Sequence, residues 1–201
     1  MSQVPPQKSA PASSDIADGR RRRGQDNRAR IVKAMLEIIQ SGEVAPSAEQ
    51  VAVRADVGLR TVFRHFQDMD SLYREMSVAI EAELRMAVDR PFLSPDWRGR
   101  LSELIQRRAV AFEKIAPFKR ASDVFRYRSK FLEADTARPV ATLREILKRH
   151  LPPEIIADSV KLEALDLLLS FESWSRLRRE QSLSAARTRE ILEAAVGRII
   201  D

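Results

Sequence analysis

The stretch Val53–Phe66, VRADVGLRTVFRHF, alternates apolar and cationic side chains too closely for an ordinary core helix. Asp56, Val57 and Gly58 interrupt its helical pattern, and glycine adopts turn geometry without steric cost. We therefore predict one short helix before the interruption and another from Leu59 to about His65. Two short helices joined by a tight turn form a helix-turn-helix.

The flanking sequence supplies further helices of a small domain. Residues 26–40 carry apolar side chains at helical spacing, and Gly42 can end that helix. Ser47 and Gln50 fit an S-x-x-Q capping box, which predicts the start of the next helix. Asp68 is the expected N-cap of a helix that leads out of the domain.

The helix predicted after the turn has an inner and an outer face. Its outer face carries Arg60, Thr61 and Arg64, with Leu59 at its edge. Such a helix fits the major groove of DNA, where Arg reads guanine and Thr or Leu can meet a thymine methyl. The expected shared core consists of Val51, Ala52, Ala55, Val57, Val62 and Phe66.

The composition narrows the possible fold classes, partners and cellular compartments. The chain has 201 residues, 6 glycines and a net charge of +6, and its abundance of Ala, Leu, Glu and Arg favours an all-α fold. The positive charge suits a polyanionic partner. Disulfides and thiolate metal sites are excluded because there is no cysteine. No secretion signal or membrane-spanning run is seen, so we expect a cytoplasmic protein.

The sequence predicts that the chain is not an enzyme and needs no cofactor or metal. It contains no HExxH, no P-loop and no GxGxxG motif. Its two histidines are His65, inside the DNA-binding stretch, and His150, at a predicted helix end where a cation is favoured. A metal site built from both histidines is the weaker alternative.

Residues 47–72, SAEQVAVRADVGLRTVFRHFQDMDSL, resemble the DNA-binding signature of the TetR family of bacterial transcriptional regulators. The resemblance implies a small DNA-binding domain followed by a larger helical domain that dimerises and often holds a ligand. It also implies a sequence-specific, ligand-responsive repressor that binds a palindromic operator as a homodimer. The matching residues are Ser47, Val51, Ala52, Ala55, Val57, Thr61, Phe63, His65, Phe66, Asp68 and Leu72.

The sequence departs from the family pattern at several positions. Asp56 replaces a turn glycine, and Gly58 replaces the usual serine. Phe63 and Met69 replace a tyrosine and a lysine that commonly contact phosphates. Arg60 is a candidate to replace the two lost phosphate contacts. The residues expected to contact DNA are Arg28, Ser47, Leu59, Arg60, Thr61, Phe63, Arg64 and His65.

Residues 1–24 are rich in Pro, Ser, Ala and Gln, and we expect them to be disordered. They contain the run Arg20, Arg21, Arg22 and Arg23. This arm either contacts phosphates or the minor groove, or is a solvated tail. The predicted organisation is therefore an arm at 1–24, a helix-turn-helix domain at 25–70 and a helical effector-binding and dimerisation domain at 71–201.

In the larger domain we expect a helix capped by Ser94, a break at Pro117 and a helix over 138–150. Two long apolar helices, 154–180 and 184–200, then close the chain. Their surplus apolar surface predicts a homodimer, in agreement with the resemblance, although an entirely intramolecular core is the alternative. The expected interface residues are Leu165, Leu169, Ile191, Ala195 and Ile199.

Aromatic residues of this domain suggest a pocket for a small-molecule effector. For each of these aromatic residues, ordinary core packing is the alternative. The basic side chains nearby either bind an anionic ligand or form a solvated face. The candidate pocket residues are Trp97, Phe112, Phe125, Phe131, Phe171 and Trp174.

The rival to a DNA-binding regulator is a dimeric helical adaptor that binds another protein and keeps a vestigial helix-turn-helix. The substitutions at Phe63 and Met69 favour the adaptor, whereas the intact outer face with Arg60, Thr61 and Arg64 favours DNA.

Overall fold

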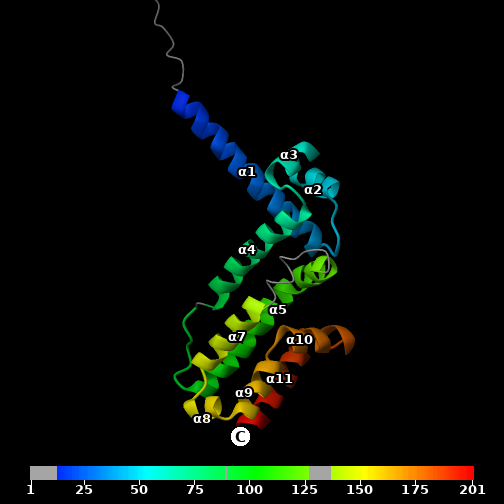
Figure 1. Cartoon of the computed structure of the whole chain (residues 1–201). Helices are drawn as coiled ribbons and strands as arrows, with labels where there is room; N and C mark the ends of the chain where they lie inside the picture. The colour runs from blue at the N-terminus through cyan, green and yellow to red at the C-terminus, as the bar shows by residue number, and fades with distance from the viewer. Residues whose placement is uncertain (1–12, 89, 127–136) are drawn as a thin grey trace, which may run out of the picture.

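The computed structural model describes residues 13–88, 90–126 and 137–201, and within these ranges every regular element is a helix (Figure 1). The predicted all-α fold is confirmed. The helix-turn-helix lies at one end of the molecule. The helices of residues 153–201 lie at the other end.

Four helices form the N-terminal end: α1 (Ser13–Gln40), α2 (Ala48–Ala55), α3 (Leu59–His65) and α4 (Met69–Val88). The predicted short helix Leu59–His65 is confirmed. Gly42 follows α1 with φ +107°, a conformation that favours glycine.

The expectation of disorder over residues 1–24 is wrong for the part that the structure describes, because α1 already begins at Ser13. Disorder was expected because residues 1–24 have few large apolar side chains to bury. However, residues 13–24 continue into the anchored helix of residues 25–40. A helix that is already nucleated gains one hydrogen bond for each residue added, so it extends without apolar burial.

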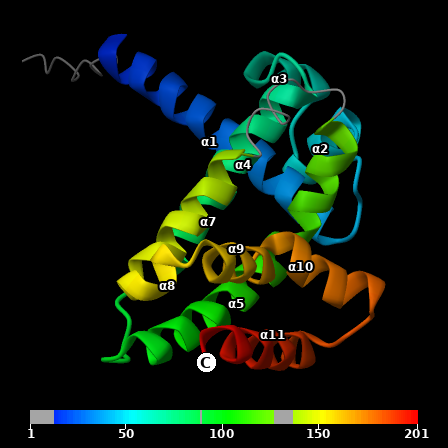
Figure 2. The same cartoon turned by 60° about the horizontal axis from the view of Figure 1, so that its bottom comes forward.

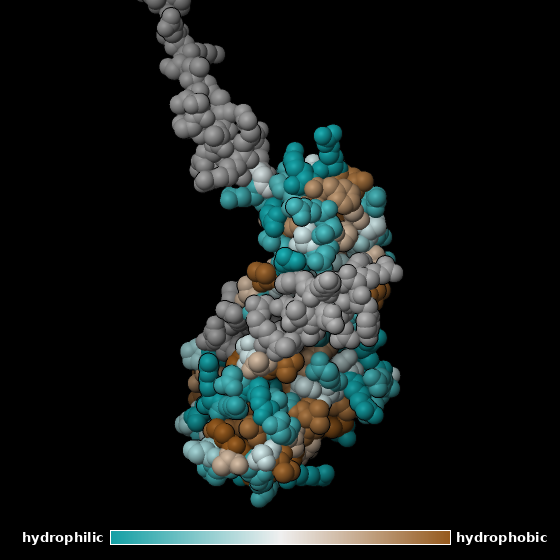
Figure 3. Space-filling model, in the orientation of Figure 1, coloured by the Kyte–Doolittle hydropathy of each residue, from teal (hydrophilic) through white to brown (hydrophobic). Residues whose placement is uncertain are grey.

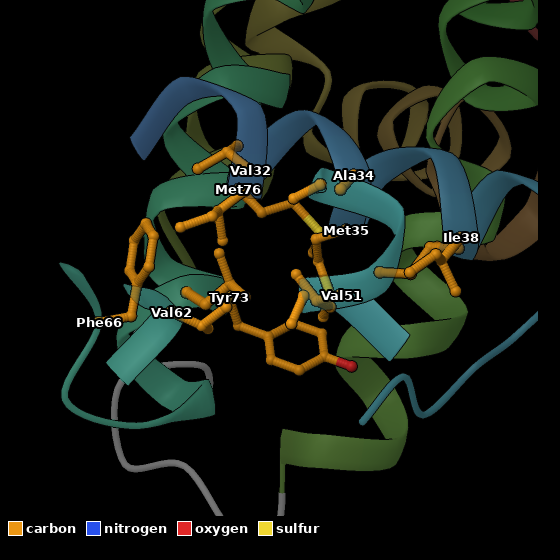
Figure 4. Packing of buried hydrophobic residues seen from close by; sticks show 14 of the residues in the cluster. Val32, Ala34, Met35, Ile38, Val51, Val62, Phe66, Tyr73 and Met76 are labelled. Carbon is orange, nitrogen blue, oxygen red and sulfur yellow. The ribbon is translucent and has the colours of Figure 1, made fainter. Parts of the chain in front are cut away.

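The N-terminal core lies between α1, α2, α3 and α4 (Figure 4). Helix α5 (Trp97–Arg126) closes it with Phe118 and Ala121. The predicted core residues of α2 and α3 are buried, and Val57 is partly buried against them. The larger side chains buried most deeply in this core are Ile31, Met35, Ile39, Val51, Val62, Phe66, Leu72, Tyr73 and Met76.

Two expectations for the start and course of α5 are wrong. The helix continues through Pro117, because Phe112 on one side and Phe118 on the other are each buried in a core. These contacts offset the backbone hydrogen bond that proline removes. The N-cap is Asp96 rather than Ser94, since the Asp96 carboxylate accepts the Gly99 N–H at 2.9 Å.

The C-terminal end is built from shorter helices than predicted. After α7 (Ala137–Arg149), the expected single helix 154–180 is divided into several elements, so that prediction is wrong. The elements are α8 (Pro153–Ala157), α9 (Ser159–Leu168), α10 (Phe171–Ser175) and the π-helical turn η1 (Arg176–Glu180).

Side-chain caps explain the interruptions. Asp158 accepts the N–H groups of Val160 and Lys161 and starts α9, and Ser170 accepts the Ser173 N–H and starts α10. The last helix is α11 (Ala185–Ile200), which agrees with the predicted range 184–200, and Ser184 caps its start. Helix α11 packs against α5 and α9 (Figure 2).

The second core takes its residues from α5, α7, α8, α9, α10 and α11. Leu165 and Leu169 are buried in it, so the expectation that they form a dimer interface is wrong. The apolar side chains that α9 leaves on the surface are Val160, 77% exposed, and Leu167, 67% exposed. Hydrophobicity alone did not distinguish the two faces of this helix, because apolar residues occur on both.

A buried cation ties this core together. Arg108 of α5 is 4% exposed and donates hydrogen bonds to the carbonyls of Leu169, at 2.7 Å, and Leu143, at 2.5 Å. Burial lowers the pKa of its guanidinium to about 10, and the charge of Asp166 opposes that shift. Arg108 therefore stays cationic at neutral pH and joins α5 to α7 and to the end of α9.

The burial of Leu165 leads to a stability prediction. Leu165→Ala should lower the free energy of unfolding by about 2–5 kcal/mol, because it leaves a cavity in a packed core. Leu93→Ala, at a leucine that is 89% exposed in a loop, should change it by less than about 0.5 kcal/mol. Urea denaturation followed by circular dichroism measures both, and equal effects would contradict the assignment of Leu165 to the core.

Candidate nucleic-acid interface

The turn between α2 and α3 depends on Asp56. Its backbone is left-handed, with φ 51° and ψ 53°, and the following Val57 N–H returns to the Ala52 carbonyl at 3.0 Å. Aspartate tolerates this conformation better than most residues. Gly58, which we expected to supply turn geometry, has φ −70° and ψ 147°, a region open to any residue.

The start of α2 is fixed by the predicted capping box. The Ser47 hydroxyl accepts the Gln50 N–H at 3.2 Å, and the Gln50 side-chain oxygen accepts the Ser47 N–H at 2.7 Å. Both bonds satisfy N–H groups that a helix leaves unpaired at its first turn. Ser47 therefore has a structural role, and its contact with DNA stays a prediction.

Helix α3 is held by one face and exposed on the other. Val62 and the adjoining Phe66 are buried, whereas Arg60, Phe63 and Arg64 are exposed. Among the described residues, neither Arg60 nor Arg64 has an ion-pair partner. At 100° per residue, these two guanidinium-bearing positions point away from the buried face. Thr61 is half-buried on one flank of the helix, and Leu59 stands at the edge of the exposed face.

Arg28 is already engaged inside the domain. Its guanidinium donates to the Glu75 carboxylate at 3.2 and 2.9 Å and to the His65 carbonyl at 2.9 Å, and it lies 4.5 Å from the centre of the Phe66 ring. These contacts tie α1 to α4 and to the C-terminal end of α3. Sequence reasoning missed Glu75 because 47 residues separate it from Arg28 and no local pattern links them. A DNA contact by Arg28 remains a prediction.

His65 is half-buried beside α1. Its Nε2 is buried and has no hydrogen-bond partner in the described part of the chain. Burial, together with the charges of Arg64 and Arg28, lowers its pKa, so the imidazole is neutral at neutral pH. These features favour packing at the helix end, and the DNA contact expected of His65 stays a prediction.

The arginine arm belongs to α1. Residues 20–23 lie in the N-terminal half of this helix, which projects beyond the other helices in both views (Figures 1 and 2). Their side chains lie outside the described part of the structure. The role of the arm in DNA binding therefore stays a prediction.

Three of the predicted pocket residues come together, but as packed core. The Phe112 ring centre lies 5.6 Å from that of Phe171 and 6.4 Å from that of Trp174. Trp97 packs at the edge of the same core. The Phe125 side chain and the whole of Phe131 lie outside the described residues.

A cleft of about 270 Å³ lies beside the aromatic cluster. Trp174 donates its indole N–H to Glu113 at 2.8 Å, and Arg178 pairs with the same carboxylate at 2.7 and 2.9 Å. These bonds, led by that from Arg178, hold the pKa of Glu113 below its usual value. The cleft is lined by Glu113, Ala116, Pro117, Arg120, Trp174, Ser175, Arg178 and Arg179, so it carries an excess of cations.

Over residues 13–88, 90–126 and 137–201, no three His, Asp or Glu side chains gather in a group suited to a metal ion. Over the same ranges, no helix has both the length and the apolar character needed to cross a membrane.

Comparisons with known proteins bear on the fold. No protein-family model matches the sequence, and no curated protein matches it. The crystal structure of SCO7518 from Streptomyces coelicolor A3(2), described as a candidate transcriptional regulator, superposes with a TM-score of 0.61. The match covers 86% of this chain and 97% of that chain at 21% sequence identity. The two proteins share a fold.

The left-handed residue in the turn gives a second prediction. Asp56→Val should unfold at least about 1 kcal/mol more easily than Asp56→Gly, because a β-branched residue is strained at positive φ. Both variants lose the exposed contact between Asp56 and Arg30, so the comparison isolates the backbone. Urea denaturation measures the difference. If valine and glycine prove equally stable at this position, the turn has another geometry.

Proposed function

We propose that this protein is a sequence-specific DNA-binding transcriptional regulator of the TetR type, with α3 as the recognition helix. The observation that carries the proposal is the exposed face of α3, where Arg60 and Arg64 lack ion-pair partners among the described residues while Val62 and Phe66 are buried behind them. The shared fold with a candidate regulator and the resemblance of residues 47–72 to the TetR signature support it.

Arg60 is the residue best suited to read a base. It is the second residue of α3, and helix-turn-helix proteins present the N-terminal residues of this helix to base edges. Its guanidinium can donate two parallel hydrogen bonds to O6 and N7 of guanine. Arg64 lies one turn further along the same face and can reach a neighbouring base or phosphate.

A homodimer on a palindromic operator is part of the proposal. Two copies related by a two-fold axis would present their α3 helices to successive major grooves. With Leu165 and Leu169 buried in the protomer, the surface that favours dimerisation is Val160 and Leu167 of α9 with the accessible side of α11. Ile191, Ala195 and Ile199 of α11 are each partly exposed there.

The cleft beside Trp174 is the candidate effector site for a ligand-responsive repressor. Its cationic lining suits a small organic anion. Helix α5 lines this cleft at Pro117 and also contributes Phe118 to the N-terminal core. A ligand that binds more tightly to one arrangement of α5 would therefore shift the DNA-competent population.

The adaptor remains the second candidate, favoured by the exposed Phe63 on α3. The two proposals differ in one measurable property. A regulator selects particular sequences from a random DNA library, whereas an adaptor with a vestigial helix-turn-helix does not.

The third prediction tests base reading by α3. Arg60→Ala should weaken binding to the selected operator by roughly 1–3 kcal/mol and relax the preference at one base pair in each half-site. Binding to unrelated DNA should fall much less. Fluorescence anisotropy over a base-substitution scan of the operator measures both effects.

The control for net charge is Arg149→Ala. It removes the same charge from an exposed position on α7, far along the chain from α3, and should leave the base preferences unchanged. If Arg60→Ala keeps every base preference of the unaltered protein, Arg60 acts only as a phosphate anchor.

The fourth prediction concerns the dimer. Introducing charge at Val160 and Leu167 together should convert the protein to a monomer, because two buried carboxylates without partners oppose association. Multi-angle light scattering on the Val160→Glu, Leu167→Glu double variant measures the mass. Leu93→Glu, at a loop leucine that is 89% exposed, is the control. A double variant that is still dimeric would locate the interface elsewhere.

A further inference from the structure

Helix α3 exposes apolar as well as cationic side chains. Leu59 is 37% exposed and Phe63 is 49% exposed, whereas Val62, the neighbour of Phe63, is 1% exposed. At the end of the molecule that holds α2 and α3, apolar surface lies among hydrophilic surface (Figure 3). These apolar groups lie on the same short helix as the exposed Arg60 and Arg64, so a partner that covers the face must suit both kinds of side chain.

Helical geometry sets Leu59 and Phe63 side by side. They are four residues apart, so they form one short apolar strip along α3. Arg60 and Arg64 form a parallel cationic strip, rotated by 100° about the helix axis. A single partner that touches this face must offer apolar groups beside negative charge or hydrogen-bond acceptors.

The major groove of DNA has this combination. Guanine offers the acceptors O6 and N7, phosphates offer negative charge, and thymine projects a 5-methyl group as the apolar feature of the groove floor. Phe63 has no polar side-chain atom and cannot donate to a phosphate. Its chemistry, like that of Leu59, suits a methyl group.

We propose that Leu59 and Phe63 recognise thymine 5-methyl groups, so that each operator half-site contains T·A pairs next to the base pair read by Arg60. This inference rests on the proposed function and adds the class of base that the apolar strip selects.

The test uses deoxyuridine, which differs from thymidine only by the absence of the 5-methyl group. An operator is first selected from a random DNA library with the full-length protein. Each thymine is then replaced singly by deoxyuridine, and Kd is measured by fluorescence anisotropy. At each contacted thymine, the loss of one buried methyl should weaken binding about fourfold.

Variants connect each methyl group to a side chain. Leu59→Ala and Phe63→Ala should each weaken binding to the thymine operator and abolish the deoxyuridine effect at their own position, leaving the other position sensitive. Both residues are exposed, so neither change should disturb folding. Val53→Ala is the matched control, because Val53 is an apolar residue on α2 that is 82% exposed, and it should leave every deoxyuridine effect unchanged.

A gain-of-contact experiment gives an independent readout. Replacing a contacted T·A pair with C·G should weaken binding, and 5-methylcytosine at the same place should recover about fourfold, since it restores the methyl group in the major groove.

The outcomes separate the two levels of the proposal. If no sequence is selected from the library, the proposed function itself fails. If an operator is selected but deoxyuridine has no effect at any position, or if the effect persists unchanged in both alanine variants, the thymine inference is overturned while sequence-specific binding stands.

Discussion

The exposed face of α3 exists because Val62 and Phe66 are buried on its opposite side. A helix of seven residues is far too short to be stable in water by itself, so its position depends on those two side chains and on the turn before it. Arg28 strengthens this attachment by joining the Phe66 ring, the His65 carbonyl and Glu75. The orientation of Arg60 and Arg64, and with it the proposed function, follows from this anchoring.

Burial of a few side chains also fixes the connection between the two ends of the molecule. Helix α5 supplies Phe112 to one core and Phe118 to the other, and both cores keep it helical through Pro117. Because the cleft beside Trp174 includes Pro117, it lies where packing of the two cores meets on a single helix. The cleft therefore adjoins a helix that both cores share.

Two arginines beside the second core, Arg108 and Arg178, play different roles. Arg108 satisfies backbone carbonyls at the end of α9 and forms part of the fixed core. Arg178 instead pairs with Glu113 at the edge of a cleft, where the added cations Arg120 and Arg179 face the same space. Arg108 supports the fold through its bonds to two backbone carbonyls, whereas Arg120 and Arg179 line an open space.

The sequence by itself determined the local features: the all-α class, the capping box of Ser47 and Gln50, the bounds of α3 and its buried stripe. These depend on residues within a few positions of one another, so propensity, spacing and caps are sufficient to predict them. The tertiary structure alone decided features that depend on distant partners. Glu75 engages Arg28, the two cores hold α5 through Pro117, and packing in the second core buries Leu165 while Leu167 stays exposed. A pattern of apolar residues identifies a helix, but only its neighbours in space decide which face they cover.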